Sequence, residues 1–354
     1  MDQPDERTSV IAFDVGGANL KAADGLGWTR SVPFPLWQRP AQLPAVLARM
    51  AADYAQQQAR GETPRRIVAT MTGEIADCYP SRRVGVEQIT AALAATAAAS
   101  VPAAELGVYL VDGTIVPAAV AAGRPLDAAA SNWHAVARLG AAHATSDRAF
   151  VVDIGSTTTD IIPIHDGRPA ARGRDDVGRL ATGELVYTGV ERTPVAALVR
   201  SLPWAGGAGP RLRPIASERY ADSRDVWLLL GDLAEDPASQ ETADGRPATR
   251  AAARVRLARM LLVDPDDFSW AAAEAAAKWC AEAQGRLVAR ALARVAQTCG
   301  WRPTSLVLSG HGGCLARRAL ARLGWEVPVV VLPEILGPDV SRAAPAHALA
   351  LIAC

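Results

Sequence analysis

The chain alternates short apolar runs with longer segments in which apolar positions recur every three or four residues. The short runs are rich in Val, Ile and Leu and predict buried strands, whereas the segments rich in Ala, Leu and Arg predict helices. The expected strands are residues 10–14, 66–72, 107–111, 149–153, 160–164, 305–309 and 329–332. The expected helices are residues 40–58, 86–99, 133–144, 194–201, 247–262, 267–297, 313–323 and 342–353. This alternation favours an α/β fold over a sandwich or a helical bundle.

One internal repeat divides the chain. The segments VIAFDVGGANLKA and FVVDIGSTTTDII each combine an apolar strand, an Asp, an apolar residue, a Gly and a small residue. The equivalent residues are Asp14 and Asp153, Gly16 and Gly155, and Gly17 and Ser156. The copies lie ~140 residues apart, the size of one lobe, so we expect two similar lobes, residues 1–145 and 146–340. Residues 202–245 are rich in Gly, Pro, Asp and Ser and predict an irregular insertion in the second lobe.

The turn in each copy has the composition of a phosphate-binding loop. Small residues leave backbone N–H groups free to wrap a phosphate, and an Asp at a strand end can hold magnesium through its water shell. The first turn offers Gly16, Gly17, Asn19 as a hydrogen-bond donor and Lys21 as a positive charge; the second offers Gly155 and the hydroxyls of Ser156, Thr157 and Thr158. Two tight hairpins that satisfy their own polar groups are the alternative. Two copies at half-chain spacing favour phosphate binding.

A third glycine cluster follows a predicted strand near the C-terminus, in LVLSGHGGCLARRAL. Gly310, Gly312 and Gly313 would let the backbone approach a ligand, and a helix is expected to begin beyond them. His311 lies between the glycines, either as a catalytic group or as a turn residue.

Two acidic segments supply further candidates. MTGEIADCYPSRR carries Glu74, which could bind an amine or a metal, and Arg82, which could meet a phosphate or a carboxylate; a solvated turn is the alternative. SERYADSRDVWLLLGD carries Asp222 and Asp225, which could hold metal, act as a base, or cap and solvate the local structure.

A glycine turn in TGELVYTGVERTP forms another candidate substrate surface. Glu184, Tyr187, Thr188 and Arg192 surround this turn, ahead of a helix opened by a proline. A structural turn and helix start would explain much of the same pattern.

Composition then limits the partners. The 37 Lys and Arg residues balance 37 Asp and Glu residues, which argues against binding to nucleic acid or anionic lipid through bulk charge. Two of the basic residues are lysines, Lys21 and Lys278. The arginine bias says little about chemistry, but Lys21 closes a glycine-rich turn and is therefore distinctive.

The cysteines and the hydropathy of the chain indicate in which cellular compartment the protein is expected. Five scattered cysteines without a CxxC pair argue against structural zinc and a disulfide framework. No apolar run approaches the ~20 residues that cross a bilayer, and the N-terminus MDQPDERTSV lacks the apolar stretch of a signal peptide. We therefore expect a reduced, cytoplasmic protein without a membrane partner. Its oligomeric state stays open, with a homodimer as one option.

The two turns and the late glycine cluster resemble, in their order along the chain, the phosphate and nucleotide loops of the actin-like ATPase superfamily, which includes sugar kinases, Hsp70 and actin. The resemblance implies a two-lobed α/β fold in which Asp14 and Asp153 surround magnesium and phosphates between the lobes. It also implies that the C-terminal helix, residues 341–354, crosses back onto the first lobe.

Further motifs resemble a narrower group. They are DVGGANLKAAD, MTGEIADCYPSRRVGV, VDIGSTTTDIIPI, RLATGELVYTGVERTPV, ASERYADSRDVWLLLGDL and LSGHGG. Spread over almost the whole chain, they look like the hydantoinase/oxoprolinase-related proteins of tetrahydromethanopterin-linked one-carbon metabolism. Residues 19–21 differ from the hydantoinase-type loop, which usually carries Thr and Asp there, and fit this branch better.

This resemblance implies a transferase of methanofuran or methylofuran biosynthesis. Archaeal members join an aminomethylfuran-methyl diphosphate to the phenol of γ-glutamyltyramine and expel diphosphate; a tyrosine derivative is another acceptor to consider. We expect Lys21 and Mg²⁺ to offset the charge on the leaving group, with Glu74 or Asp225 accepting the phenol proton. The alternatives are an ATP-dependent small-molecule kinase and a hydantoinase- or oxoprolinase-type hydrolase. A nucleotide-sensing regulator is disfavoured, because neither a helix-turn-helix extension nor a basic face is evident.

Overall fold

The first lobe is built on a mixed sheet. The computed structural model describes residues 9–57, 64–101, 104–204 and 211–354. Strands of the first sheet lie in the order β3-β2-β1-β4-β5-β6. They are β1 (Val10–Val15), β2 (Asn19–Ala23), β3 (Thr29–Pro33), β4 (Arg66–Met71), β5 (Glu105–Tyr109) and β6 (Ile115–Pro117). β1 pairs antiparallel with β2 and parallel with β4, and β4 continues parallel with β5.

The second lobe repeats this arrangement. Its main path runs β10-β8-β7-β13-β14, with β9 paired to β8. The strands are β7 (Arg148–Ile154), β8 (Thr159–His165), β9 (Arg168–Pro169), β10 (Leu185–Val186), β13 (Ser305–Gly310) and β14 (Val329–Val331). β7 pairs antiparallel with β8 and parallel with β13, as β1 does with β2 and β4. The duplication expected from the sequence is therefore present in the strand topology.

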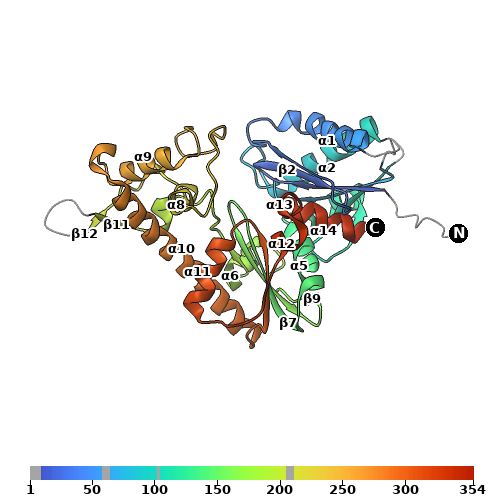
Figure 1. The fold of residues 1–354 in the computed structure, drawn as a ribbon. Helices are drawn as coiled ribbons and strands as arrows, with labels where there is room; N and C mark the ends of the chain where they lie inside the picture. Colours follow the sequence, from blue (N-terminus) through green and yellow to red (C-terminus); the bar gives the residue numbers. More distant parts are fainter. Residues whose placement is uncertain (1–8, 58–63, 102–103, 205–210) are drawn as a thin grey trace.

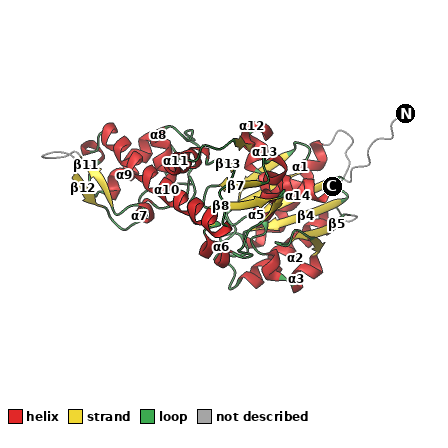
Figure 2. Ribbon diagram, turned by 90° about the horizontal axis from the view of Figure 1, so that it is seen from below, coloured by secondary structure: helices red, strands yellow, loops and turns green. Residues whose placement is uncertain are grey.

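Each sheet buries one face under helices of its own lobe. The helices of the first lobe are η1 (Pro40–Gln42), α1 (Leu43–Gln57), α2 (Arg82–Ser100), α3 (Ala118–Gly123) and α4 (Pro125–Ala128). Phe13, Leu47 and Ile89 belong to their shared core. In the second lobe α10 (Trp270–Cys299) and α11 (Gly313–Leu323) pack together, and Phe150 and Leu315 belong to the core there. Figure 2 shows the strands of both sheets between helices.

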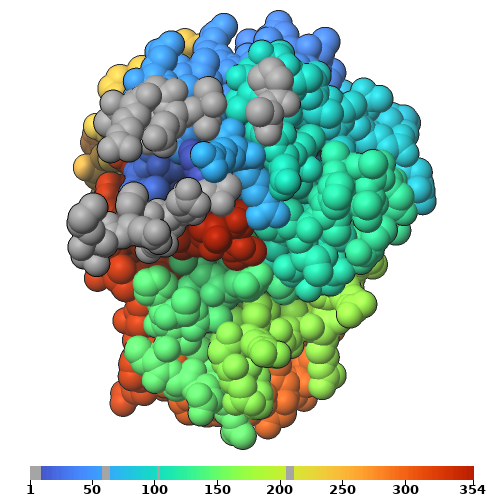
Figure 3. Space-filling view, turned by 90° about the vertical axis from the view of Figure 1, so that its right-hand side faces the viewer, coloured from blue at the N-terminus to red at the C-terminus, as the bar shows by residue number. Residues whose placement is uncertain are grey.

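Two helices join the lobes. α14 (Ala344–Ala353) packs on β1 and β4 of the first sheet, while α5 (Asn132–His143) packs on β7, β8 and β13 of the second. The helices also contact each other, and one apolar cluster contains residues of both sheets and both helices. A Cβ added to Gly140 would lie 2.4 Å from Val151 Cγ2, so α5 and β7 approach too closely for a larger residue. On the face shown in Figure 3, the C-terminal segment is visible at the waist between the lobes.

An insertion extends from the second lobe, on the left of Figure 1. It contains β11 (Ser201–Trp204), β12 (Arg211–Pro214), α8 (Ser223–Leu230), α9 (Arg250–Met260) and η2 (Pro265–Asp267). The remaining short helices are α6 (Asp176–Thr182), α7 (Val195–Leu198), α12 (Leu332–Leu336) and α13 (Pro338–Arg342). In the described residues, no helix is both long and apolar enough to span a membrane.

The hydrophobic pattern located the buried elements better than the exposed ones. Each of the seven expected strands corresponds to an observed strand, with ends shifted by at most a few residues. The expected helix at residues 194–201 shortens to α7, and its last residue begins β11. β3, α6 and α8 were missed, because β3 mixes polar with apolar positions and the two helices are short. Part of the predicted irregular insertion, residues 205–210, lies outside the described residues.

Candidate functional site

An ion cluster lies where the two hairpins face each other. Lys21 on β2 is the direct cross-strand partner of Asp14 on β1, and its Nζ lies 3.5 Å from Asp14 Oδ2. The Lys21 charge also lowers the pKa of Asp153, which lies on β7 of the other lobe. Lys21 therefore pairs with Asp14, and its charge also acts on Asp153 at the end of the first strand of the other sheet.

Both aspartates lack full charge compensation. Burial raises the pKa of Asp14, although Lys21 acts against it. Burial and the neighbouring Asp160 raise the pKa of Asp153 to about 6, against the effects of Ser309, Lys21 and His311. Asp14 Oδ1 is buried without a hydrogen-bond partner. A buried Asp14 and a half-buried Asp153 are thus both influenced by the single ammonium of Lys21, and a further cation would compensate their charge.

The two turns have matching backbone geometry. Gly16 N donates to Asn19 O at 3.1 Å, and Gly155 N donates to Thr158 O at 3.0 Å. In the first turn the carbonyls of residues 17 and 18 accept from Leu36 N and Phe34 N. Because C=O and the following N–H point in opposite directions in a trans peptide, the N–H groups of residues 18 and 19 point away from that covering segment.

The second turn is covered in the same way by residues 189–192. Ser156 O accepts from the backbone N–H groups of Glu191 and Arg192, and Gly155 O accepts from residue 190. A Cβ on Gly189 would lie 2.5 Å from Gly155 O, so only glycine fits against the turn. The N–H groups of Ser156 and Thr157 consequently point away from this segment. The sequence TGVERTP thus covers the phosphate turn with its backbone.

The third glycine cluster packs against the same strand end. Gly310 has φ +75°, and a Cβ there would lie 2.3 Å from Ile154 O and 2.9 Å from Asp153 Oδ1. A Cβ on Gly312 would lie 2.1 Å from Ile154 Cγ2. These glycines are therefore required for packing on β7. Gly313 begins α11 directly after them.

His311 projects from this third loop toward the covering segment. Its Nε2 lies 2.9 Å from Glu191 Oε1, and Glu191 also pairs closely with Arg224. Burial alone would raise the pKa of Glu191, but the contacts with His311 and Arg224 lower it to about 2. Glu191 is therefore an ionised carboxylate beside the second turn. The sequence pattern gave no reason to select it.

Glu74 lies next to the first turn, on the loop after β4. Thr72 N and Gly73 N both donate to Val15 O, which holds this loop at the end of β1. Glu74 is 1% exposed, and neither of its carboxylate oxygens makes a well-formed hydrogen bond. Burial raises its pKa to about 7; Asp176 contributes to this rise, while backbone N–H groups and Arg82 oppose it. A buried carboxyl that titrates near neutrality has the properties of a general base.

An ion pair connects the lobes beside Glu74, and a second one lies next to it within the second lobe. Arg82 on α2 bonds to Asp176 on α6 at 3.1 Å. Arg179, also on α6, is 1% exposed, pairs closely with Asp160 and lies 4.3 Å above the Trp133 ring. Arg82 was predicted from its motif, but its partner and the buried arginine were not, because the sequence pattern did not predict α6.

A second contact between the lobes involves Arg192, whose guanidinium lies 5.7 Å from the centre of the Trp37 ring. Tyr187 is 63% exposed on the surface before this segment. Arg192 is therefore near the second turn, as its backbone hydrogen bond to Ser156 also shows. Trp37 was not among the predicted site residues, since a lone Trp before a proline-rich turn carries no motif.

Other predicted site residues have structural partners. Glu184 is buried and accepts hydrogen bonds from the backbone N–H groups of Arg172 and Gly173 and from a Thr hydroxyl. Thr188 is buried and accepts from Gln284 Nε2 at 2.9 Å. Both residues order the loops behind the second turn. The substrate contact predicted for each stays a prediction, and the observed hydrogen bonds favour a supporting role.

Asp222 and Asp225 form the capping box of α8. Asp225 is 1% exposed and pairs with Arg256 at 2.6 Å, while Asp222 pairs with Arg219. These contacts use both carboxylates for the insertion, and neither residue joins the Lys21 cluster in the described contacts. Burial raises the pKa of Asp225 to about 6, and its oxygens accept hydrogen bonds from Asp222 N and Arg256 Nε, so the base predicted at Asp225 stays a prediction that these contacts do not favour.

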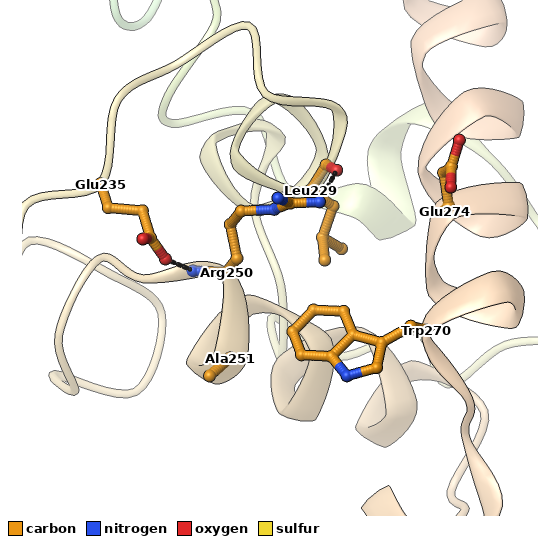
Figure 4. A pocket seen from close by; sticks show the side chains of 6 residues that line it. All are labelled: Leu229, Glu235, Arg250, Ala251, Trp270 and Glu274. Carbon is orange, nitrogen blue, oxygen red and sulfur yellow. Dashed lines mark hydrogen bonds between the residues drawn. The ribbon is translucent and has the colours of Figure 1, made fainter.

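A hollow in the insertion lies apart from these residues. It is lined by Leu229, Glu235, Arg250, Ala251, Trp270 and Glu274, from α8, α9, α10 and the loop after α8 (Figure 4). None of the predicted site residues lines it. The candidate site is instead the region between the lobes, defined by the two turns, the third loop and Glu74.

The repeated sheets, the two facing turns and the crossing helices define a two-lobed protein of the actin-like ATPase fold. The profile of the Hydantoinase/oxoprolinase family (Hydantoinase_A) matches residues 65–352, and the chain belongs to this family. The fold is similar to that of a solved acetone carboxylase described as "Mechanism of ATP-Dependent Acetone Carboxylation, Acetone Carboxylase nucleotide-free structure". That likeness has 12% identity and a TM-score of 0.51, and covers 98% of this chain and 70% of the other.

Two curated relatives share one name, (4-{4-[2-(gamma-L-glutamylamino)ethyl]phenoxymethyl}furan-2-yl)methanamine synthase. The Methanocaldococcus jannaschii protein is 30% identical over 346 residues, 96% of each chain. The Methanococcus vannielii protein is 30% identical over 205 residues, which cover 57% of this chain and 89% of the relative. The first match spans both lobes and includes the predicted site.

Proposed function

We propose that the protein is a transferase of methanofuran- or methylofuran-type cofactor biosynthesis. It would join a furylmethyl diphosphate to the phenol of a γ-glutamyltyramine or tyrosine derivative and release diphosphate. The name of the full-length relatives supports this reaction, since it describes a phenoxymethyl-furan ether. The observation that carries the proposal is the cluster of Lys21 with Asp14 and Asp153 between two phosphate-type turns.

Charge balance supports a divalent cation at this cluster. A diphosphate would not approach Asp14 and Asp153 favourably with Lys21 as the sole counter-charge, because like charges repel strongly in a partly buried site. Among the described residues, no group of three or more His, Cys, Asp or Glu could hold a metal. Two carboxylates with water and phosphate oxygens nevertheless suit Mg²⁺, and the unpartnered Asp14 Oδ1 provides a ligand atom. When bound, magnesium would neutralise the diphosphate as it leaves.

The protein's own groups would stabilise the developing charge. Breaking the bond between the furylmethyl carbon and diphosphate places negative charge on the leaving oxygen, and the furan stabilises the cation-like carbon. Lys21 and the outward N–H groups of Ser156 and Thr157 would bind that charge. The phenol oxygen then forms the new C–O bond to the carbon.

Glu74 is the proposed base for the phenol proton. It lies beside the first turn, is buried without a good hydrogen-bond partner and has a pKa of about 7. A carboxylate with this pKa is ionised in a useful fraction at neutral pH and accepts a proton more readily than an ordinary surface glutamate. Arg82 lies nearby and would help to orient it or the substrate.

The decisive experiment combines the purified chain with the furylmethyl diphosphate, γ-glutamyltyramine and magnesium, without ATP. We expect equal amounts of ether and diphosphate, measured by mass spectrometry and a diphosphate assay. Parallel reactions replace the acceptor with its tyrosine analogue. Absence of ether with both acceptors would contradict the proposal, and ATP consumption that depends on an added alcohol would identify a kinase instead. Ring opening of a hydantoin or of 5-oxoproline would identify a hydrolase.

A further inference from the structure

His311 has a nitrogen available for a ligand. Its Nε2 lies 2.9 Å from Glu191 Oε1 without forming a well-aligned hydrogen bond, and Nδ1 has no hydrogen-bond partner among the described residues. The ring is about one-third exposed, so a ligand between the lobes can reach it. Its position is constrained, because Gly310 and Gly312 hold the loop against the end of β7.

The location of His311 is tied to the second turn through Glu191. Glu191, which binds the ring, donates its backbone N–H to Ser156 O in that turn. The charge of His311 also acts on Asp153 at the end of β7. The imidazole is therefore close to both the carboxylate and the turn to which the diphosphate is assigned.

Contacts on both sides of Glu191 restrict the orientation of the imidazole beside it. It lies between His311 and Arg224, and Arg224 is fixed further by a hydrogen bond to Ser239 Oγ at 3.3 Å. The ionised Glu191 carboxylate beside Nε2 is an acceptor for a proton on that nitrogen, and a ring with a proton on each nitrogen donates from both. Nδ1–H would then be directed to an acceptor outside the pair.

We propose that His311 donates a hydrogen bond from Nδ1 to the diphosphate, and that Glu191 is the positioning residue that orients the ring. The inference rests on the proposed function and adds a second cationic contact to Lys21, from the opposite lobe. An imidazolium bound to phosphate oxygen forms a charge-assisted hydrogen bond, which is stronger than a neutral one. Diphosphate would thereby hold the two lobes together through Lys21 and His311.

Nitrogen NMR of the full chain tests this contact directly. The chain contains five histidines, so histidine-specific ¹⁵N labelling gives a small set of ring signals, and His311→Gln identifies those of His311 by their loss. Inorganic diphosphate is added with magnesium. We expect the His311 Nδ1 signal to move to a hydrogen-bonded position. An unchanged signal at saturating diphosphate would overturn the proposal; the shift is measured in the unmodified protein, and the His311→Gln spectrum serves only to assign the signals.

Calorimetric binding of diphosphate supplies the second readout. His311→Gln should bind diphosphate about 10- to 100-fold more weakly, and Glu191→Gln should weaken binding and reduce the shift of the Nδ1 signal. The matched control is His165→Gln. His165 also lies next to a carboxylate, 3.2 Å from Asp166, but at the end of β8 that is farther from the second turn. If His311→Gln binds diphosphate as tightly as the wild type does, His311 is not part of the diphosphate site, whereas the proposed function is unaffected. If the wild type does not bind diphosphate, the proposed function and this inference both fail.

Discussion

Lys21 and Asp160 occupy equivalent positions in the two hairpins but carry opposite charges. Lys21 is the cross-strand partner of Asp14, and Asp160 is the cross-strand partner of Asp153. Asp160 is compensated within its own lobe by Arg179, whereas Lys21 acts on aspartates of both lobes. The duplicated hairpins are therefore asymmetric in charge, and Lys21 lies at the point where an anionic leaving group is proposed to bind.

Replacing Lys21 by Met should weaken diphosphate binding about 10- to 100-fold, because it removes a charge-assisted contact of about 1.5–3 kcal/mol. Lys21→Arg should retain part of the affinity. Titration calorimetry with magnesium present measures both. Lys278→Met is the matched control, since Lys278 is exposed on α10 and pairs with Glu274. Equal affinity in Lys21→Met and wild type would exclude Lys21 from the site.

Much of the fold could be predicted because it depends on local pattern. The buried strands β1 and β7 are apolar at almost every position, and the repeated Asp and Gly that follow them identify the two lobes. The partners of these motifs could not be predicted in the same way. Glu191 and Arg179 become important only through contacts that depend on tertiary structure.

The assignment of carboxylates shows this limit most clearly. Glu74 and Asp225 look alike in sequence, as acidic residues in polar segments. The structure distinguishes them, because Asp225 has Arg256 and a capping hydrogen bond, whereas the Glu74 oxygens lack good partners. The free energy of a buried charge depends on its neighbours in space, and these are not encoded by residue spacing alone.

Asp14→Asn should reduce the dependence of diphosphate binding on magnesium. The substitution removes one of two carboxylates near Lys21 and with it a proposed metal ligand. We expect weaker affinity with magnesium but equal or stronger affinity in EDTA, so the ratio between the two conditions falls at least about tenfold. Asp166→Asn, at an exposed turn, should keep the wild-type ratio. An unaltered ratio in Asp14→Asn would show that this carboxylate does not serve the cation.

Glu74 predicts an acid limb in the pH profile of the transfer reaction. The carboxylate form is the base, so the rate should fall about tenfold per pH unit below the pKa of about 7. Glu74→Gln should lower turnover about 10²- to 10⁴-fold and remove this limb. Ether formation measured from pH 5.5 to 8.5 checks both effects. A variant that is as active as the wild type, or that retains the same limb, would assign the proton to another group.

The same carboxyl predicts an effect on stability. Because burial raises the pKa of Glu74 from 4.5 to about 7, the folded protein holds a proton that the unfolded chain releases between these values. Its contribution therefore becomes less favourable as the pH rises through this window, by about 3 kcal/mol in total. Glu74→Gln has no carboxyl to titrate there and should not lose this part of the free energy of unfolding. Urea unfolding at pH 5 and pH 8 should show a smaller decrease for the variant, and identical decreases would contradict the assigned pKa.

Asp225→Asn separates a structural role from a catalytic one. It leaves the buried Arg256 without its closest carboxylate, and removal of one partner of a buried pair costs about 3–5 kcal/mol. We expect a lower urea midpoint but a turnover per folded molecule within about twofold of the wild type, because the remaining capping contacts belong to α8 rather than to the phosphate turns. Folded protein is quantified by circular dichroism in the same samples used for ether formation. A loss of turnover as large as that expected for Glu74→Gln, in a fully folded sample, would instead return Asp225 to the catalytic set. Burial raises the pKa of both Glu74 and Asp225, but only Glu74 lacks a hydrogen-bond partner for its oxygens. Comparison of Glu74→Gln with Asp225→Asn therefore tests whether the missing partner, rather than the raised pKa alone, identifies the base.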